Sequence, residues 1–199
     1  MKDSIPELIT DNLIITVLSS EDFSLLATYE NNNRVHLSKW EPIRTDNYFT
    51  DESVKKRVEL NFNSFQSGSS ISLVGLDKSR SRIICTCNFS NIVHGVFQAC
   101  NLGYSVNYQD EGKGLMFEML RESIDYAFTK VELHRVMANY MPSNVRSGQL
   151  LTKLGFEKEG IAKSYLKIIG LWQDHVLTSK INPSHIGKTY QATNDKSSF

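Results

Sequence analysis

Apolar residues change their spacing along the chain near residue 70, and the change separates two kinds of predicted element. Before it, an apolar, β-branched run over 13–18 predicts a strand, and the polar run 19–22 supplies a helix start ahead of Phe23. The Asn-rich, proline-containing segment 31–47 is typical of irregular chain, and 51–65 again has helical spacing. We therefore expect a strand, a helix, an irregular segment and a second helix.

From residue 70 onward, short β-rich runs follow one another and are separated by turn residues. These runs cover 71–76, 83–89, 96–100 and 102–106. No stretch between them is long enough for a crossover helix, so they predict an antiparallel meander.

Strand and helix patterns alternate after the meander. Segment 115–128 has an apolar stripe at helical spacing, 134–140 is typical of a strand, and a further helix through Leu150 and Leu154 stops at Gly155. Gly155 suits a left-handed helix cap.

The last part of the chain predicts a hairpin and a tail. Segments 163–169 and 172–180 flank Gly170, and 183–199 is polar and rich in turn residues. We expect an α/β fold of the α+β kind, with one domain over 1–182 and a partly disordered tail over 183–199.

Composition excludes several classes of function. Lys plus Arg and Asp plus Glu number 22 each, so no net basic charge attracts nucleic acid. No apolar run approaches the roughly 20 residues of a membrane helix, and the first residues lack the apolar core of a signal peptide. We expect a cytoplasmic monomer or homodimer that binds neither nucleic acid nor membranes.

The three cysteines favour a reduced core over a metal site. Cys85 and Cys87 have no second Cys or His pair at the spacing that zinc needs, so we expect no metal. Cys100 could be an acylated nucleophile with His94 or His134 as its base, but no third group that would orient the base is evident.

The loop 109–114 has the composition of a phosphate-binding turn. It lies between a predicted strand and a predicted helix start, where backbone N–H groups can bind an anion. Gly112 and Gly114 allow close approach of the backbone, and Lys113 adds a positive charge. The spacing fits neither a nucleoside triphosphate P-loop nor a dinucleotide fingerprint, because Leu115 follows Gly114 and a third glycine is missing.

Two motifs in order resemble the GNAT superfamily of N-acetyltransferases. Residues 102–106 followed by Gln109-x-x-Gly112-x-Gly114 are similar to the coenzyme A strand and loop of that family, and Asn144-x-x-Ser147 with 154–156 is similar to its second half. Residues 36–42, 134–148, 154–160 and 172–178 resemble one branch, the ribosomal-protein-alanine N-acetyltransferases. The likeness runs from about residue 13 to residue 180.

The resemblance implies a fold and a reaction. The fold is a central mixed, mostly antiparallel, twisted sheet, flanked by helices, with a V-shaped splay between strands 102–106 and 134–140. Acetyl-CoA is the co-substrate, and the acceptor is a protein N-terminal amine, above all an alanine-first ribosomal protein, that attacks the thioester directly. The residues implied to bind the coenzyme are Tyr104, Ser105, Val106, Gln109, Glu111, Gly112, Lys113, Gly114, Leu115, Asn139, Asn144 and Ser147.

Two residues are candidates for the chemistry. The backbone amide at Val106 is expected to stabilise the oxyanion. Many family members carry a tyrosine seven residues after the asparagine, but Leu151 stands there. Ser147 is therefore our candidate to assist the departing thiolate, unless its hydroxyl only bonds a helix carbonyl.

Trp40 and Glu41 are the candidates for the acceptor groove. A small N-terminal residue needs apolar contact and an acidic group for its ammonium, although Trp40 could equally be a buried anchor. A small-amine acetyltransferase for a polyamine or aminoglycoside, and a non-catalytic acetyl-CoA-binding module, remain the alternative functions.

Overall fold

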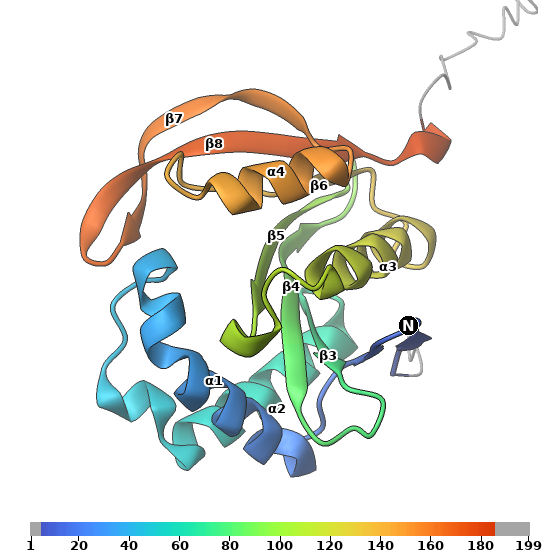
Figure 1. Ribbon diagram of the computed structural model, residues 1–199. Coiled ribbons are helices and arrows are strands. Elements are labelled where there is room, and N and C mark those ends of the chain that lie inside the picture. Colours follow the sequence, from blue (N-terminus) through green and yellow to red (C-terminus); the bar gives the residue numbers. More distant parts are fainter. Residues whose placement is uncertain (1–4, 186–199) are drawn as a thin grey trace, which may run out of the picture.

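The computed structural model describes residues 5–185, and in this part of the chain eight strands form one sheet (Figure 1). The strand order is β1-β2-β3-β4-β5-β6-β8-β7, and every neighbouring pair is antiparallel except β5–β6. The strands are β1 (Glu7–Ile9), β2 (Ile14–Thr16), β3 (Ile71–Leu76), β4 (Ile83–Val93), β5 (Ala99–Val106), β6 (Arg135–Met137), β7 (Glu157–Ile168) and β8 (Leu171–Ile181). The α-helices are α1 (Phe23–Leu37), α2 (Asp51–Ser67), α3 (Leu115–Thr129) and α4 (Val145–Lys153). The predicted mixed, mostly antiparallel sheet is confirmed.

Helices cover both faces of this sheet. Alternate residues of a strand point to opposite faces, so each face builds its own core. Cys85 and Cys87 of β4 pack with Met119 of α3 and Leu151 of α4 in one buried cluster. A second cluster joins Ile14, Val74 and Ile83 of the sheet to Ala27 of α1 and to Val54 and Val58 of α2. The molecule therefore has an α1/α2 face and an α3/α4 face.

The two central strands separate after three paired residues. β5 and β6 are parallel from Ala99–Arg135 to Asn101–Met137. β6 also pairs with β8 on its other side, and beyond Met137 the chain keeps only this second pairing, in which the Tyr140 N–H donates to the Val176 carbonyl at 3.2 Å. The second half of β5 is thus left without a partner on that side, which confirms the expected splay.

One predicted strand is wrong. The segment 94–98 forms the turn between β4 and β5, so the run 96–100 is not a strand of its own. Gly95 has a φ of +76°, and Val96 and Phe97 are exposed at the turn. These apolar residues produce a strand-like pattern in the sequence, although their side chains are exposed in the fold.

The segment 31–47 is less irregular than predicted, because α1 continues to Leu37. The Asn31 and Asn33 side-chain amides donate to carbonyls one helical turn earlier, on Ala27 and Tyr29. Asparagines therefore occur here without ending the helix. The expected helices over 51–65 and 115–128 are confirmed, as is the hairpin, whose first strand begins earlier than predicted, at Glu157.

The end of the chain is only partly described. Pro183–His185 forms a short 3₁₀ turn, and the rest of the predicted tail lies outside the described residues.

Candidate active site

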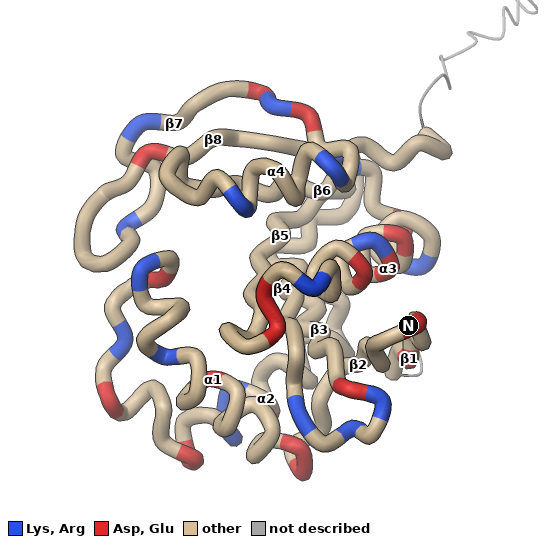
Figure 2. The backbone as a smooth tube through the Cα atoms, viewed as in Figure 1, with Lys and Arg blue, Asp and Glu red and all other residues tan. Residues whose placement is uncertain are grey.

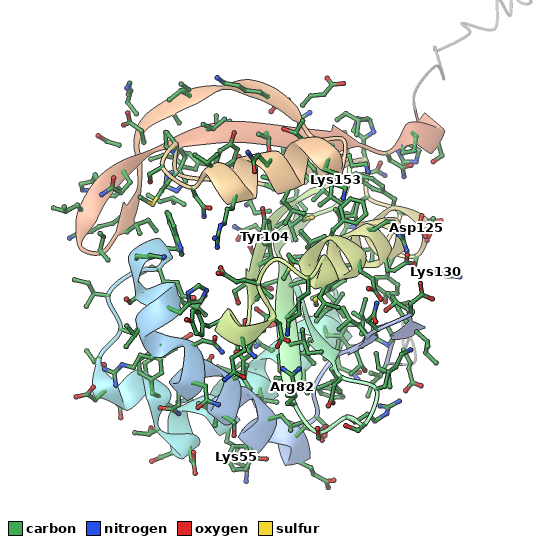
Figure 3. The ribbon with its side chains drawn as sticks, viewed as in Figure 1. Lys55, Arg82, Tyr104, Asp125, Lys130 and Lys153 are labelled. Atoms are coloured by element: carbon green, nitrogen blue, oxygen red, sulfur yellow. The ribbon has the colours of Figure 1, made fainter. Side chains whose placement is uncertain are left out.

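Consecutive residues of β5 reach opposite faces of the sheet beside the splay. The Tyr104 hydroxyl lies on the α3/α4 face, 2.7 Å from the Ser147 hydroxyl of α4 (Figure 3). The Ser105 hydroxyl lies on the α1/α2 face, 2.8 Å from the Tyr29 hydroxyl and 2.7 Å from Thr86 Oγ1. A group in the splay is therefore within reach of side chains from both faces.

The backbone beside the splay offers unused hydrogen-bonding groups. The Asn107 N–H donates to the Ile84 carbonyl of β4 at 2.8 Å. Backbone groups alternate in direction along a strand, so those of Tyr104 and Val106 point away from β4, toward the splay. On the other side, Ala138 and Tyr140 bond to β8, so the backbone of Asn139 faces the splay as well. An extended chain that carries amides could pair with these edges.

The loop before α3 has the backbone geometry of an anion site. Gly112 and Gly114 have φ values of +75° and +79°, a conformation that other residues rarely adopt. Across residues 5–185, no protein acceptor takes the N–H groups of Gly112, Lys113 or Gly114. The first turn of α3 adds further free N–H groups and the positive end of the helix dipole. The predicted diphosphate-binding character of this loop therefore has a physical basis.

Asp110 anchors the loop, a role that its sequence pattern does not predict. Its buried carboxylate accepts hydrogen bonds from Arg82 at 2.5 Å and from Lys113 and Asn107, both at 2.8 Å. The Arg82 guanidinium, with help from the other two donors, holds the pKa of Asp110 well below its usual range. Lys113, predicted to contact phosphate, here neutralises Asp110. Its ammonium is half exposed.

Glu111 links this loop to two helices. Its carboxylate accepts a hydrogen bond from Arg146 of α4 at 2.7 Å and lies 3.3 Å from the His36 ring of α1. Figure 2 marks the acidic positions of the loop before α3 in red and the basic positions of α4 in blue. Gln109 is exposed and Leu115 begins α3, so both border the same loop.

The start of α4 fixes Ser147. Asn144 caps the helix, and its side-chain oxygen accepts the Ser147 N–H at 3.2 Å. Leu151, at the position where many relatives carry tyrosine, is buried in the core. The tyrosine hydroxyl next to Ser147 belongs to Tyr104 of β5. Burial raises the pKa of Tyr104 to about 12, so this hydroxyl stays protonated at neutral pH. Asn139, by contrast, directs its side-chain oxygen to the Thr178 N–H of β8, at 3.2 Å.

Gly148 lets α4 pack directly against Tyr140. A Cβ at this position would lie 2.8 Å from the tyrosine ring. We expect Gly148→Ala to lower the free energy of unfolding by about 1–3 kcal/mol, because ring and helix must move apart. Chemical denaturation would measure it, with Gly160→Ala as control, since a Cβ there has no neighbour within 4 Å. Equal stability of the two variants would contradict this packing.

A cavity of about 560 Å³ lies on the α1/α2 face. Ser105 and Tyr29 line it, together with Glu30, Glu41 and Ile169 at the tip of the β7–β8 hairpin. The Ile169 N–H donates to the Glu41 carbonyl at 3.0 Å, which ties the hairpin to the segment after α1. Glu41, a candidate for the acceptor groove, thus lines this cavity. Trp40 is not part of the cavity wall and lies half-buried beside Lys39.

The cysteines do not form a nucleophilic or metal site. All three are buried, and burial raises the pKa of the Cys100 thiol to about 12. The thiolate needed for covalent catalysis is therefore absent at neutral pH. Among residues 5–185 no group of three or more His, Cys, Asp or Glu side chains is placed to hold a metal ion. No helix in the same range is long and apolar enough to cross a membrane.

Comparisons with known proteins agree with this geometry. The acetyltransferase (GNAT) domain family matches residues 12–157. The [ribosomal protein uS5]-alanine N-acetyltransferase of Escherichia coli (strain K12) is 46% identical over 177 residues, which are 88% of this chain and 91% of the relative.

Two solved structures have the same fold. The ribosomal-protein-S5-alanine acetyltransferase of Vibrio fischeri is 39% identical, with a TM-score of 0.86, over 89% of this chain and 97% of that one. The structure of Mycobacterium smegmatis RimJ in complex with CoA-disulfide has a TM-score of 0.81 at 23% identity, over 94% of this chain and 91% of that one.

Proposed function

The chain belongs to the GNAT acetyltransferase family, and from this premise we propose that it transfers acetyl from acetyl-CoA to a protein N-terminal α-amine, most readily that of an alanine-first ribosomal protein. The observation that carries the proposal is the two-sided environment of β5. Tyr104 and the anion-binding loop serve one face of the splay, and Ser105 and the cavity serve the other. Acetyl-CoA on one face and the acceptor amine on the other can therefore reach each other through the splay in the sheet. We place the reaction in the cytoplasm, where ribosomal proteins are made.

Acetyl-CoA would lie along the α3/α4 side of the splay. Its diphosphate fits the free N–H groups of residues 112–114 and the start of α3, and its pantetheine amides fit the backbone of Tyr104, Val106 and Asn139. Sulfur and carbonyl then lie next to Val106, close to Ser147. The Arg146–Glu111 ion pair spans from α4 to the loop and must leave room for the coenzyme.

The acceptor amine would enter from the cavity. Glu41 is half-buried there, and in the described chain its carboxylate has no hydrogen-bond or ion-pair partner. Burial raises the pKa of Glu41. An incoming ammonium would relieve this desolvated charge, so Glu41 can hold the N-terminus before attack.

Transfer needs no covalent enzyme intermediate. The neutral amine attacks the thioester carbon, the Val106 N–H stabilises the oxyanion, and the C–S bond then breaks with its electron pair on sulfur. We assign Ser147 to hydrogen-bond the thiolate, and Tyr104, whose hydroxyl lies 2.7 Å away, can donate a hydrogen bond to Ser147 in turn. A protonated tyrosine behind the serine makes the serine hydroxyl a better proton donor.

A panel of acceptors tests the proposal. The protein is incubated with acetyl-CoA and peptides that begin with Ala, Ser or Met, beside spermidine and an aminoglycoside, while free thiol and product mass are followed. We expect one acetyl group on the α-amine of the Ala-first peptide and none on the same peptide with a blocked N-terminus. Turnover on the small amines alone would make the enzyme a small-amine acetyltransferase, and acetyl-CoA binding without turnover would indicate a binding module.

A further inference from the structure

We propose that Glu30 is the proton acceptor for the attacking amine. This role rests on the proposed function, since it assigns the base inside the same cavity. Glu30 lies on α1, directly after Tyr29, and both residues line the cavity. The Tyr29 hydroxyl bonds to Ser105, the residue that precedes Val106 on β5. Glu30 and Ser105 thus line the same cavity, next to the strand that would hold the thioester.

Arg57 of α2 fixes the Glu30 carboxylate. The guanidinium donates a hydrogen bond to Glu30 Oε2 and a second one to the Tyr48 carbonyl, at 2.6 Å. It also stacks on the Tyr48 ring, 3.7 Å from the ring centre. Arg57 engages Oε2, and no hydrogen bond from residues 5–185 engages Glu30 Oε1, so this second oxygen remains free to accept a proton.

The charges around Glu30 are mixed. The titratable and charged groups that line the cavity with it are Tyr29 and Arg34 from α1, Arg57 from α2, Cys87 from β4, and Glu41, Arg44 and Tyr48 from the segment between these helices. Burial raises the pKa of Glu30 to about 7, with Arg57 opposing and Glu41 adding to the rise. A carboxylate with this pKa is ionised in the resting enzyme just above pH 7 and can still hold a proton, unlike an exposed glutamate.

The proton balance of the step is complete. The amine lone pair forms the N–C bond, and the carbonyl electron pair moves to oxygen, to which the Val106 N–H donates a hydrogen bond. The ammonium-like nitrogen passes one proton to Glu30. Collapse of the oxyanion breaks the C–S bond, and the thiolate takes a proton from the Ser147–Tyr104 pair, which solvent then restores. Glu30 releases its proton to water when the product leaves.

The pH dependence of kcat/KM tests this role, because a merely structural ion pair between α1 and α2 would not contribute to it. With Glu30 ionised near pH 7 and the peptide amine neutral near pH ~8, the wild-type profile should fall with slope two below pH 7. Glu30→Gln should lower kcat by about 10²-fold and leave a slope of one, from the amine alone. Glu52→Gln, an exposed acid of α2, should keep the wild-type profile.

A second variant covers the case in which Glu30→Gln does not fold. Arg57→Gln removes the cation that favours ionised Glu30, so the lower limb of the profile should move to higher pH. Unchanged profiles in whichever of the two variants folds would assign Glu30 to helix packing and overturn its role as base. The profile uses whichever amine the enzyme acetylates, so a failure of the peptide would contradict the proposed function and leave the Glu30 result readable.

Discussion

Replacing Asp110 by alanine is expected to lower the free energy of unfolding by about 2 kcal/mol and to weaken acetyl-CoA binding roughly tenfold. The carboxylate is buried and accepts hydrogen bonds from Arg82, Lys113 and Asn107, so its loss leaves three donors without their acceptor. Arg82 is half exposed and can turn to water, which keeps the stability loss below that of a fully buried pair. The loop that presents Gly112 and Gly114 would then lose its fixed shape.

Denaturation and calorimetric titration with acetyl-CoA measure the two effects. Glu122→Gln, which breaks an exposed ion pair with Arg121 on α3, is the matched control and should change neither quantity. A variant at Asp110 that binds acetyl-CoA like the wild type would show that the loop keeps its shape without this anchor.

The same carboxylate should make stability depend on pH. Because the folded-state pKa of Asp110 lies below the unfolded value of about 3.9, its stabilisation is present above that value and disappears as the pH falls toward the folded pKa. The stability difference between wild type and Asp110→Asn should therefore be largest at neutral pH and shrink below about pH 4.

The backbone geometry of the loop 109–114 could be predicted from the sequence, whereas the contacts that hold the loop in place could not. Gly112, Gly114 and the start of α3 are neighbours in the chain, and their spacing alone indicates an anion site. The anchor of Asp110 is Arg82, which lies 28 residues away at the end of a turn before β4. Nothing in the sequence pairs these two residues, because the antiparallel β4–β5 register brings them together only in the folded chain.

On the proposed acceptor side, too, local chemistry could be predicted but contacts between distant residues could not. Glu41 was predicted from its own chemistry, but Glu30 lies on a helix that was expected to end near residue 31. Its partner Arg57 belongs to the next helix. Only the packing of α1 against α2 removes Glu30 and Arg57 from solvent and brings them together as an ion pair. Trp40 was a candidate for apolar contact with the acceptor, beside the acidic Glu41, but the cavity on the α1/α2 face is lined by Ile43 and Ile169 and not by Trp40.

The short pairing between β5 and β6 is the least predictable part of the fold. The sequence suggests a strand over 134–140, but β6 pairs with β5 only through Met137. Apolar periodicity does not report where two strands diverge, because residues on both sides of the divergence remain buried on one face. The splay became an expectation through family resemblance, and its physical origin is that the chain beyond Met137 loses its pairing with β5 and keeps only its pairing with β8.

Loss of the Ser147 hydroxyl is the second large effect that we expect. Ser147→Ala should lower kcat by about 10²-fold and leave the KM for acetyl-CoA nearly unchanged, because the hydroxyl acts on the developing thiolate and not on the bound thioester. Tyr104→Phe keeps the ring that packs in the core but removes its hydroxyl, which lies 2.7 Å from Ser147. If the tyrosine acts only through the serine, the double variant should be no slower than Ser147→Ala alone.

Steady-state kinetics on the four proteins of this double-mutant cycle separate a relay from two independent groups. Additive losses in kcat would mean that Tyr104 and Ser147 act separately on the reacting atoms, and a wild-type rate for Ser147→Ala would reduce the serine to a helix residue. A loss in the double variant no larger than that of Ser147→Ala alone would mean that Tyr104 of β5 and Ser147 of α4 act together as the general acid. The hydroxyl that many relatives supply from the position of Leu151 would then be supplied here from the strand, while Leu151 itself fills the core.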